Sequence, residues 1–87
     1  MPKVQKEIMI KNPQGLHARP AAIFVQTAAK YNADISITKD GEKVNGKSIM
    51  GILMLAAERG SKVIVEADGE DAEQAIRDLE EFLSKNE

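Results

Sequence analysis

One short stretch, Gly15-Leu16-His17-Ala18-Arg19-Pro20-Ala21, contains the residues best suited to carry chemistry. His17 is the one histidine among 87 residues. It lies just before an alanine-rich run, 21–29, that no glycine or proline interrupts. The first amide groups of a helix lack partners and carry partial positive charge, so they oppose protonation of a nearby ring. A neutral ring nitrogen placed there is a nucleophile, and the same amides would bind the anion if that nitrogen accepted a phosphoryl group.

Three neighbours of this histidine fit a phosphate site. The guanidinium of Arg19 can make paired contacts with phosphate oxygens. Pro20 suits the first turn of a helix, where a missing N–H is tolerated, and Gly15 supplies a flexible approach. The simpler alternative is that His17 caps the helix and Arg19 is a solvated charge. Residue chemistry alone leaves both interpretations open.

Other kinds of site find less support in the residues. With one histidine and no cysteine, a metal site is not expected, and no nucleophile-elbow motif suggests a serine hydrolase. The stretch from Gly41 to Ser48 matches the G-x-x-x-x-G-K-[ST] pattern of nucleotide-binding P-loops. However, Asp40-Gly41 is a strong hairpin signal, and Glu42 would put a negative charge into a phosphate cradle. Ser48 is better interpreted as a helix N-cap, which leaves a small P-loop nucleotide-binding protein as a remote alternative.

The elements that would position these residues follow from hydrophobic spacing. Alternation of apolar and polar residues predicts four strands, and helical spacing predicts three helices, in the order β-α-β-β-α-β-α. One buried and one wet face per strand indicates a two-layer α+β sandwich, with an antiparallel sheet covered on one side. The strands are predicted at 4–11, 33–39, 42–45 and 61–67, and the helices at 18–31, 48–58 and 71–84.

The predicted core is aliphatic, because the chain contains only one tyrosine, two phenylalanines and no tryptophan. Asn32 is expected to be the left-handed cap of the first helix, and Gly60 to end the second. Ile49, Met50 and Leu53 lie on the side of the second helix that cannot face the sheet, which predicts an exposed apolar patch. The positions predicted to point inward are Ala21, Ala22, Val25, Ala28 and Ala29 in the first helix, Ile35, Ile37, Val63, Val65 and Ala67 in the strands, and Ala72, Ala75, Ile76, Leu79, Phe82 and Leu83 in the last helix.

Bulk composition narrows the class of protein further. Apolar residues make up 43% of the chain and charged residues 30%, with a formal net charge of −2, which is ordinary for one globular domain. The longest nearly unbroken apolar run, 49–57, is far too short for a membrane span. No basic, aromatic-rich cluster suggests nucleic-acid binding. A cytoplasmic protein without membrane insertion is therefore expected.

Two motifs together carry a family resemblance. Gly-Leu-His-Ala-Arg-Pro-Ala, followed further along by Gly46-Lys47-Ser48-Ile49-Met50-Gly51, resembles the HPr family, the histidine-containing phosphocarrier proteins of the bacterial phosphotransferase system. The likeness spans nearly the whole chain, so residues 1–87 are expected to form a single HPr-like domain. It implies an open-faced β-sandwich with strand order 1-4-2-3. It also implies that His17 accepts phosphate on its pros nitrogen, Nδ1, and that Arg19 steadies that phosphate.

The resemblance implies a carrier rather than an enzyme, with no cofactor, acting as a monomer. Enzyme I, charged by phosphoenolpyruvate, would phosphorylate His17, and enzyme IIA domains would take up the phosphate during sugar uptake. Ser48 would be a regulatory phosphorylation site for an HPr kinase/phosphorylase, with a transcriptional regulator as a further partner. Ile49, Met50 and Leu53 would dock partners. A nitrogen-type or mainly regulatory HPr paralogue without sugar transport is the alternative, although the presence of His17 argues against control through serine alone.

Overall fold

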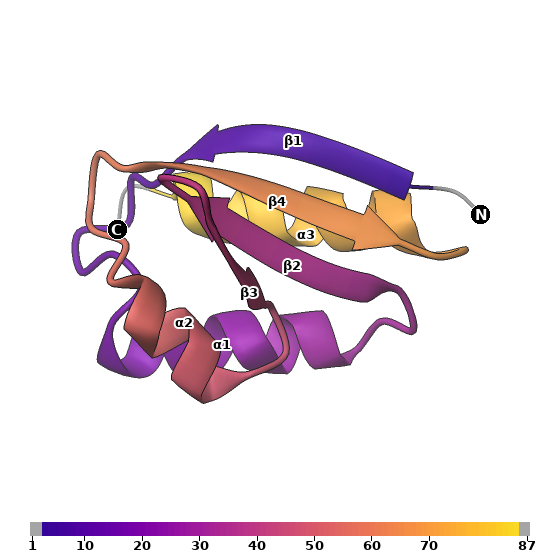
Figure 1. The fold of residues 1–87 in the computed structure, drawn as a ribbon, viewed down its shortest axis with the longest axis horizontal. Helices are drawn as coiled ribbons and strands as arrows, with labels where there is room; N and C mark the ends of the chain where they lie inside the picture. Colours follow the sequence, from indigo (N-terminus) through magenta and orange to yellow (C-terminus); the bar gives the residue numbers. More distant parts are fainter. Residues whose placement is uncertain (1–2, 86–87) are drawn as a thin grey trace.

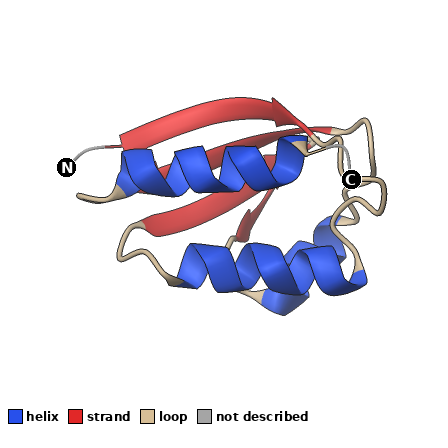
Figure 2. Cartoon of the chain, turned by 180° about the vertical axis from the view of Figure 1, so that it is seen from behind, coloured by secondary structure: helices blue, strands red, loops and turns tan. Residues whose placement is uncertain are grey.

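The computed structural model describes residues 3–85, which form a four-stranded antiparallel sheet with three helices on one face. The strand order is β1-β4-β2-β3, so the predicted element order and the strand order implied by the resemblance are both confirmed. The elements are β1 (Lys3–Met9), α1 (Ala18–Ala29), β2 (Asp34–Lys39), β3 (Glu42–Asn45), α2 (Ile49–Leu55), β4 (Lys62–Asp68) and α3 (Ala72–Ser84). Figure 1 shows α1 and α2 below the strands and α3 behind them, and Figure 2, from the opposite side, shows α3 in front of the strands.

The β2–β3 hairpin turns at Asp40 and Gly41, as the sequence predicts. Both residues have positive φ, 52° and 83°, as a two-residue turn between twisted strands requires. Lys39 then pairs with Glu42 across the turn. The residues that match the P-loop pattern therefore form a hairpin turn and a paired strand. They do not form the phosphate-binding loop that the pattern would predict.

The core lies between the sheet and the helices and follows the predicted strand pattern closely. Every inward strand position predicted is buried, and so is most of the α3 face. The face of α1 differs: Phe24 is fully buried, whereas Ala29 is exposed. A phenylalanine ring fills space that a row of alanines would leave empty, and unfilled core volume is destabilising. The fully buried set includes Ala21, Phe24, Ala28, Ile37, Val63, Val65, Ala67, Leu79 and Leu83.

Two helix ends differ from the predictions. The first helix ends at Ala29, and Lys30 follows it with a right-handed φ of −71°, so Asn32 is not its left-handed cap. The second helix ends at Leu55, because Ala56 already adopts the left-handed conformation with φ 54°. Gly60, the predicted end, lies in the loop beyond.

The first strand is also shorter than predicted. β1 ends at Met9 because the next residues bond to other parts of the chain: the N–H of Ile10 donates to Ser61, and that of Lys11 to Leu83. Within residues 3–85, none of the helices has the length and apolar character needed to cross a membrane.

Asp71 joins the start of α3 to the turn after α1. Its carboxylate accepts hydrogen bonds from the N–H groups of Asn32, at 2.8 Å, and Ala33, at 2.9 Å. The bond from Asn32, and then that from Ala33, hold the pKa of Asp71 below its ordinary value. The interaction therefore stabilises the fold fully above the carboxyl's unfolded pKa, and this contribution is lost as the pH falls through the lower, folded pKa.

Replacing Asp71 with asparagine should lower the thermal midpoint at about pH 7, and the difference from the wild type should shrink as the pH falls toward about 2. The neutral amide keeps the shape of the side chain but forms weaker bonds to the two N–H groups. Thermal unfolding followed by circular dichroism across this range measures the effect. Glu73→Gln, at an exposed position in the first turn of the same helix, is the control and should change little. A constant difference between Asp71→Asn and the wild type at every pH would contradict the assignment.

Candidate functional site

His17 occupies the N-cap position of α1, but its side chain does not cap the helix. Its backbone is extended, with φ −117° and ψ 155°, and the ring makes no cap hydrogen bond. The side chain is exposed. Of the two interpretations that the residues left open, the simple helix cap is therefore wrong, and the ring can be reached from solvent at the positive end of a twelve-residue helix.

The backbone bends sharply directly after this histidine. Ala18, the first residue of α1, has a φ of +52°, which costs a residue with a Cβ about 1–2 kcal/mol. Such strain persists where the surroundings determine the conformation. Here Ala18 itself is exposed, but the bend lies between two buried residues, Leu16 before it and Pro20 after it. The two buried residues therefore fix the backbone on both sides of His17 and Ala18.

Residues 10–17, called the His17 loop below, connect β1 to α1 and are hydrogen-bonded to the segment after α2. The N–H of Leu16 donates to the carbonyl of Ala57 at 2.9 Å. Gly15, with φ +63°, lies so close that a Cβ built on it would be 2.6 Å from the same carbonyl oxygen. The sequence predicted only a flexible approach at Gly15. The structure shows that the residue is small because backbone from another element passes directly against it.

Arg19 is the second residue of α1 and is exposed. It lines a shallow groove of about 370 Å³ beside the start of the helix. Arg19 therefore lies two residues after His17, in the first turn of the same helix. The other residues that line the groove are Asn12, Pro13, Gln14, Pro20, Ile23 and Phe82.

Ser48 is the N-cap of α2, as predicted. Its hydroxyl oxygen accepts a hydrogen bond from the N–H of Gly51 at 3.1 Å. The preceding residue, Lys47, reaches across to the end of α1, where its ammonium group donates to the carbonyl of Tyr31 at 2.7 Å. The start of α2 is therefore tied to α1 and has a defined position on the helical layer.

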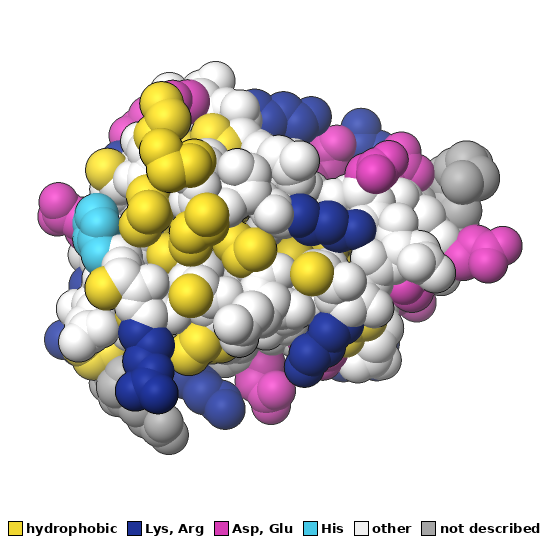
Figure 3. All heavy atoms as spheres, turned by 90° about the horizontal axis from the view of Figure 1, so that it is seen from below, with side chains coloured by type: hydrophobic (Ala, Val, Ile, Leu, Met, Phe, Trp, Pro, Cys, Tyr) yellow, Lys and Arg dark blue, Asp and Glu magenta, His cyan; other side chains and the backbone are white. Residues whose placement is uncertain are grey.

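A continuous set of exposed apolar side chains lies on α2. We define the α2 patch as Ile49, Met50, Leu53 and Met54, which are 38–67% exposed, while Ile52 between them is fully buried. The exposure predicted for the first three is confirmed. Met54 was missed, although it lies one helical turn after Met50 in sequence. Figure 3 shows hydrophobic side chains gathered over this side of the molecule, with the histidine at their edge and lysine and arginine side chains around them.

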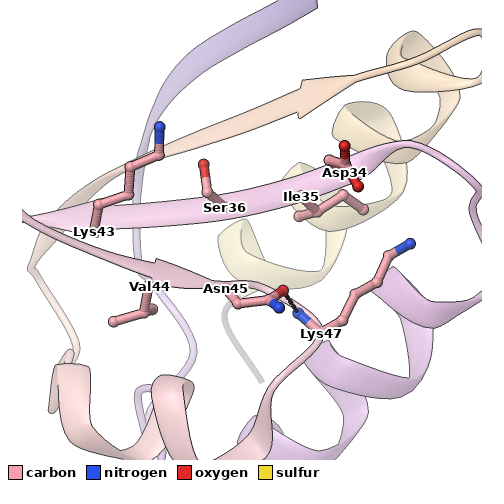
Figure 4. Close-up of a pocket in the computed structure, with 7 residues that line it drawn as sticks. All are labelled: Asp34, Ile35, Ser36, Lys43, Val44, Asn45 and Lys47. Carbon is pink, nitrogen blue, oxygen red and sulfur yellow. Dashed lines mark hydrogen bonds between the residues drawn. The ribbon is translucent and has the colours of Figure 1, made fainter.

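A groove of about 400 Å³ lies elsewhere, at the β2–β3 edge of the sheet (Figure 4). Its lysines are already engaged, Lys43 with Glu66 at 3.6 Å and Lys47 with Tyr31. The side chain of Asn45 accepts from the N–H of Lys47. The candidate site residues do not line this groove, so it is separate from the His17 loop. It is lined by Asp34, Ile35, Ser36, Lys43, Val44, Asn45 and Lys47.

The fold and the His17 loop are those of one protein family. The family model described as "PTS HPr component phosphorylation site" matches residues 4–85, so this chain belongs to the HPr family of phosphocarrier proteins. It is 43% identical to the HPr-like protein Crh of Bacillus subtilis over 94% of this chain and 96% of that protein. It is 42% identical to the phosphocarrier protein HPr of Neisseria meningitidis, over 93% and 91% of the two chains. The crystal structure of HPr from Bacillus anthracis matches with a TM-score of 0.93 and 48% identity, covering 94% and 98%.

The prediction of a monomer is wrong by comparison with solved relatives. An HPr dimer from Thermoanaerobacter tengcongensis is 56% identical over 83% of each chain, with a TM-score of 0.70. Crh of Bacillus subtilis forms a dimer with a swapped domain, at 42% identity, 95% coverage of each chain and a TM-score of 0.77. Strands at a sheet edge can pair with a second copy, and one chain's hydrophobic pattern does not reveal that complementarity.

Proposed function

We propose that His17 receives a phosphoryl group on Nδ1 from enzyme I, which is charged by phosphoenolpyruvate, and passes it to an enzyme IIA domain in sugar uptake. The observation that carries this proposal is the exposed ring of His17, which is not used as a cap at the start of α1. In a family described by its phosphorylation site, the chain's one histidine is the natural acceptor. The chain would carry phosphate without catalysing a reaction of its own.

The transfer needs little from the carrier beyond a positioned nucleophile. The lone pair on Nδ1 attacks phosphorus, a new N–P bond forms, and the bond from phosphorus to the donor breaks. The phosphate's charge then lies near the unpaired amides of the first turn of α1, which favour an anion. Arg19 is placed to add charge-assisted hydrogen bonds to the phosphate oxygens. Reversal of the same step on the partner side delivers the group onward.

The α2 patch is the proposed docking surface for both partners, with Ile49, Met50 and Leu53 in the roles expected from the motif and Met54 added. Two observations support it: the side chains are exposed, and the segment after α2 is bonded to the His17 loop through Ala57. A partner seated on α2 would therefore have the histidine within reach. Methionine side chains suit a surface that must fit more than one partner.

Direct labelling tests the acceptor role. We expect ³¹P NMR of the chain with enzyme I and phosphoenolpyruvate to show one phosphoramidate signal, assigned to Nδ1 of His17. Omitting enzyme I is the control and should leave the protein unlabelled. Absence of a signal with active enzyme I, or a phosphate on another residue or on Nε2, would contradict the proposal.

We further propose that Ser48 is a regulatory phosphorylation site for an ATP-dependent HPr kinase/phosphorylase. A phosphate there would add about −1.5 to −2 charge beside the α2 patch. Since Asp and Asn cap helices equally well, Ser48→Asp and Ser48→Asn form a matched pair that differs in charge. We expect Ser48→Asp to accept phosphate from enzyme I about tenfold more slowly, or about 1.4 kcal/mol. Equal rates for the pair would contradict control through charge at this position.

A mainly regulatory or nitrogen-type paralogue without sugar transport is the second candidate function. The relatives named Crh support it, because Crh of Bacillus subtilis is a catabolite repression protein. A kinase gene beside this one would favour regulation, whereas a neighbouring enzyme IIA gene for a sugar would favour uptake. The exposed histidine favours a chain that still takes up phosphate from enzyme I.

A further inference from the structure

The two most exposed large apolar side chains in the described part of the molecule are both methionines of the α2 patch. Met54 is 67% exposed and Met50 is 63% exposed. They lie four residues apart in α2, so their side chains are neighbours on one helix face. Ile52 and Leu55, on the opposite side, are buried and hold the helix to the body of the protein. The two thioether groups are therefore open to solvent but contribute little to the core.

We propose that Met50 and Met54 form an oxidation site through which peroxide disables the α2 patch; this rests on the docking role proposed above. The thioether sulfur attacks one oxygen of hydrogen peroxide, and the O–O bond breaks. The sulfur is oxidised to a sulfoxide, and the peroxide is reduced to water, which takes up the second oxygen and both protons. Each side chain gains one oxygen atom, and no other reactant is needed.

The physical effect is confined to binding. A sulfoxide is polar, and a docked partner would remove it from water without a matched hydrogen-bond donor, which weakens association. The fold is spared because both side chains are largely outside the core. His17 itself is unchanged, so the loss appears in transfer between proteins and not in the chemistry of the ring.

Met9 provides an internal control. It is 43% exposed, but it lies on β1 next to the buried Ile8, so it points to the face of the sheet that the helices leave uncovered. Its oxidation changes a surface on the opposite side from α2. The proposal therefore assigns the effect to two of the chain's four methionines.

The test compares phosphoryl transfer from enzyme I before and after treatment of the full chain with hydrogen peroxide. Rates from untreated protein are measured first, since absence of labelling there would refute the proposed function itself. We expect the oxidised wild type, with sulfoxides located by peptide mass mapping, to accept phosphate about tenfold more slowly, and methionine sulfoxide reductases to restore the rate. Thermal unfolding should show that the oxidised protein remains folded.

Two variants separate the sites. Met50→Leu combined with Met54→Leu keeps an apolar patch that cannot be oxidised, and it should hold its rate after treatment while retaining Met9. Met9→Leu should slow as the wild type does. An oxidised wild type that transfers at the untreated rate, or a double variant that slows equally, would overturn the proposal while leaving the phosphocarrier function intact.

Discussion

Replacing His17 with alanine should abolish phosphoryl acceptance from enzyme I, with labelling reduced by about a thousandfold or more, to background. This chain contains no second histidine, and a hydroxyl such as that of Ser48 does not form the same N–P bond. Because the ring of His17 is exposed and makes no cap hydrogen bond, its removal should change stability by less than about 0.5 kcal/mol. Loss of labelling would then report chemistry and not unfolding.

The measurement is transfer of radioactive phosphate from phosphoenolpyruvate through enzyme I, with acid lability as the signature of phosphohistidine. Thermal unfolding of the His17→Ala variant is the accompanying control. Acid-labile label that persists on the variant would refute the assignment of His17 as acceptor. A variant that unfolds at a much lower temperature than the wild type would instead show that the ring has a structural role. That result would contradict the exposed ring without a cap hydrogen bond that the structure shows.

The second large effect is expected at Gly15. An alanine there must adopt a φ of +63° and place its Cβ 2.6 Å from the carbonyl oxygen of Ala57. Left-handed strain of about 1–2 kcal/mol and overpacking of about 1–3 kcal/mol together predict a loss of about 2–5 kcal/mol in the free energy of unfolding. The backbone at Ala57 cannot rotate away as a flexible side chain would, so the His17 loop must shift instead. Transfer from enzyme I should therefore slow about ten- to a hundredfold, even at temperatures where the variant is folded.

Gly41→Ala is the matched control for this prediction. Gly41 also has positive φ, 83°, but a Cβ on it would meet nothing within 4 Å, so only the strain of about 1–2 kcal/mol applies. It lies in the β2–β3 hairpin, outside the His17 loop and outside that loop's bond to Ala57, and should leave the transfer rate unchanged. Chemical denaturation and transfer rates of the two variants decide the matter. Equal stability loss in both, with no change in rate for Gly15→Ala, would show that the contact with Ala57 does not position the site.

Local patterns were sufficient for much of this fold. The alternation of Val63, Val65 and Ala67 predicts a half-buried strand because side chains on a strand alternate between faces. Asp40-Gly41 predicts its turn because both residues tolerate positive φ. Ser48 predicts its cap because a hydroxyl can accept from the first turn of a helix. Each inference depends on neighbours in sequence, and each is confirmed in the structure.

The predictions that were wrong concern features that depend on residues far apart in sequence or on a second chain. Ala56 ends α2 in a left-handed conformation, although nothing in its residue type marks it as a helix end, because the chain must turn there to bring Ala57 to the His17 loop. Phe24, and not the predicted Ala29, is buried on the inner face of α1. The space between helix and sheet must be filled by side chains of sufficient volume, which helical spacing alone does not predict. The dimers among solved relatives depend on a second chain, which a single sequence does not contain.

The stretch from Gly15 to Ala21 illustrates both sides. The sequence by itself determined which residues could do the chemistry, since a lone histidine before a helix, followed by arginine and proline, is a local arrangement with local consequences. The tertiary structure alone decided that the ring is exposed and makes no cap hydrogen bond, that Ala18 is strained, and that Gly15 is held against Ala57. Those facts arise from contacts between segments far apart in the chain, and such contacts exist only once the core has packed.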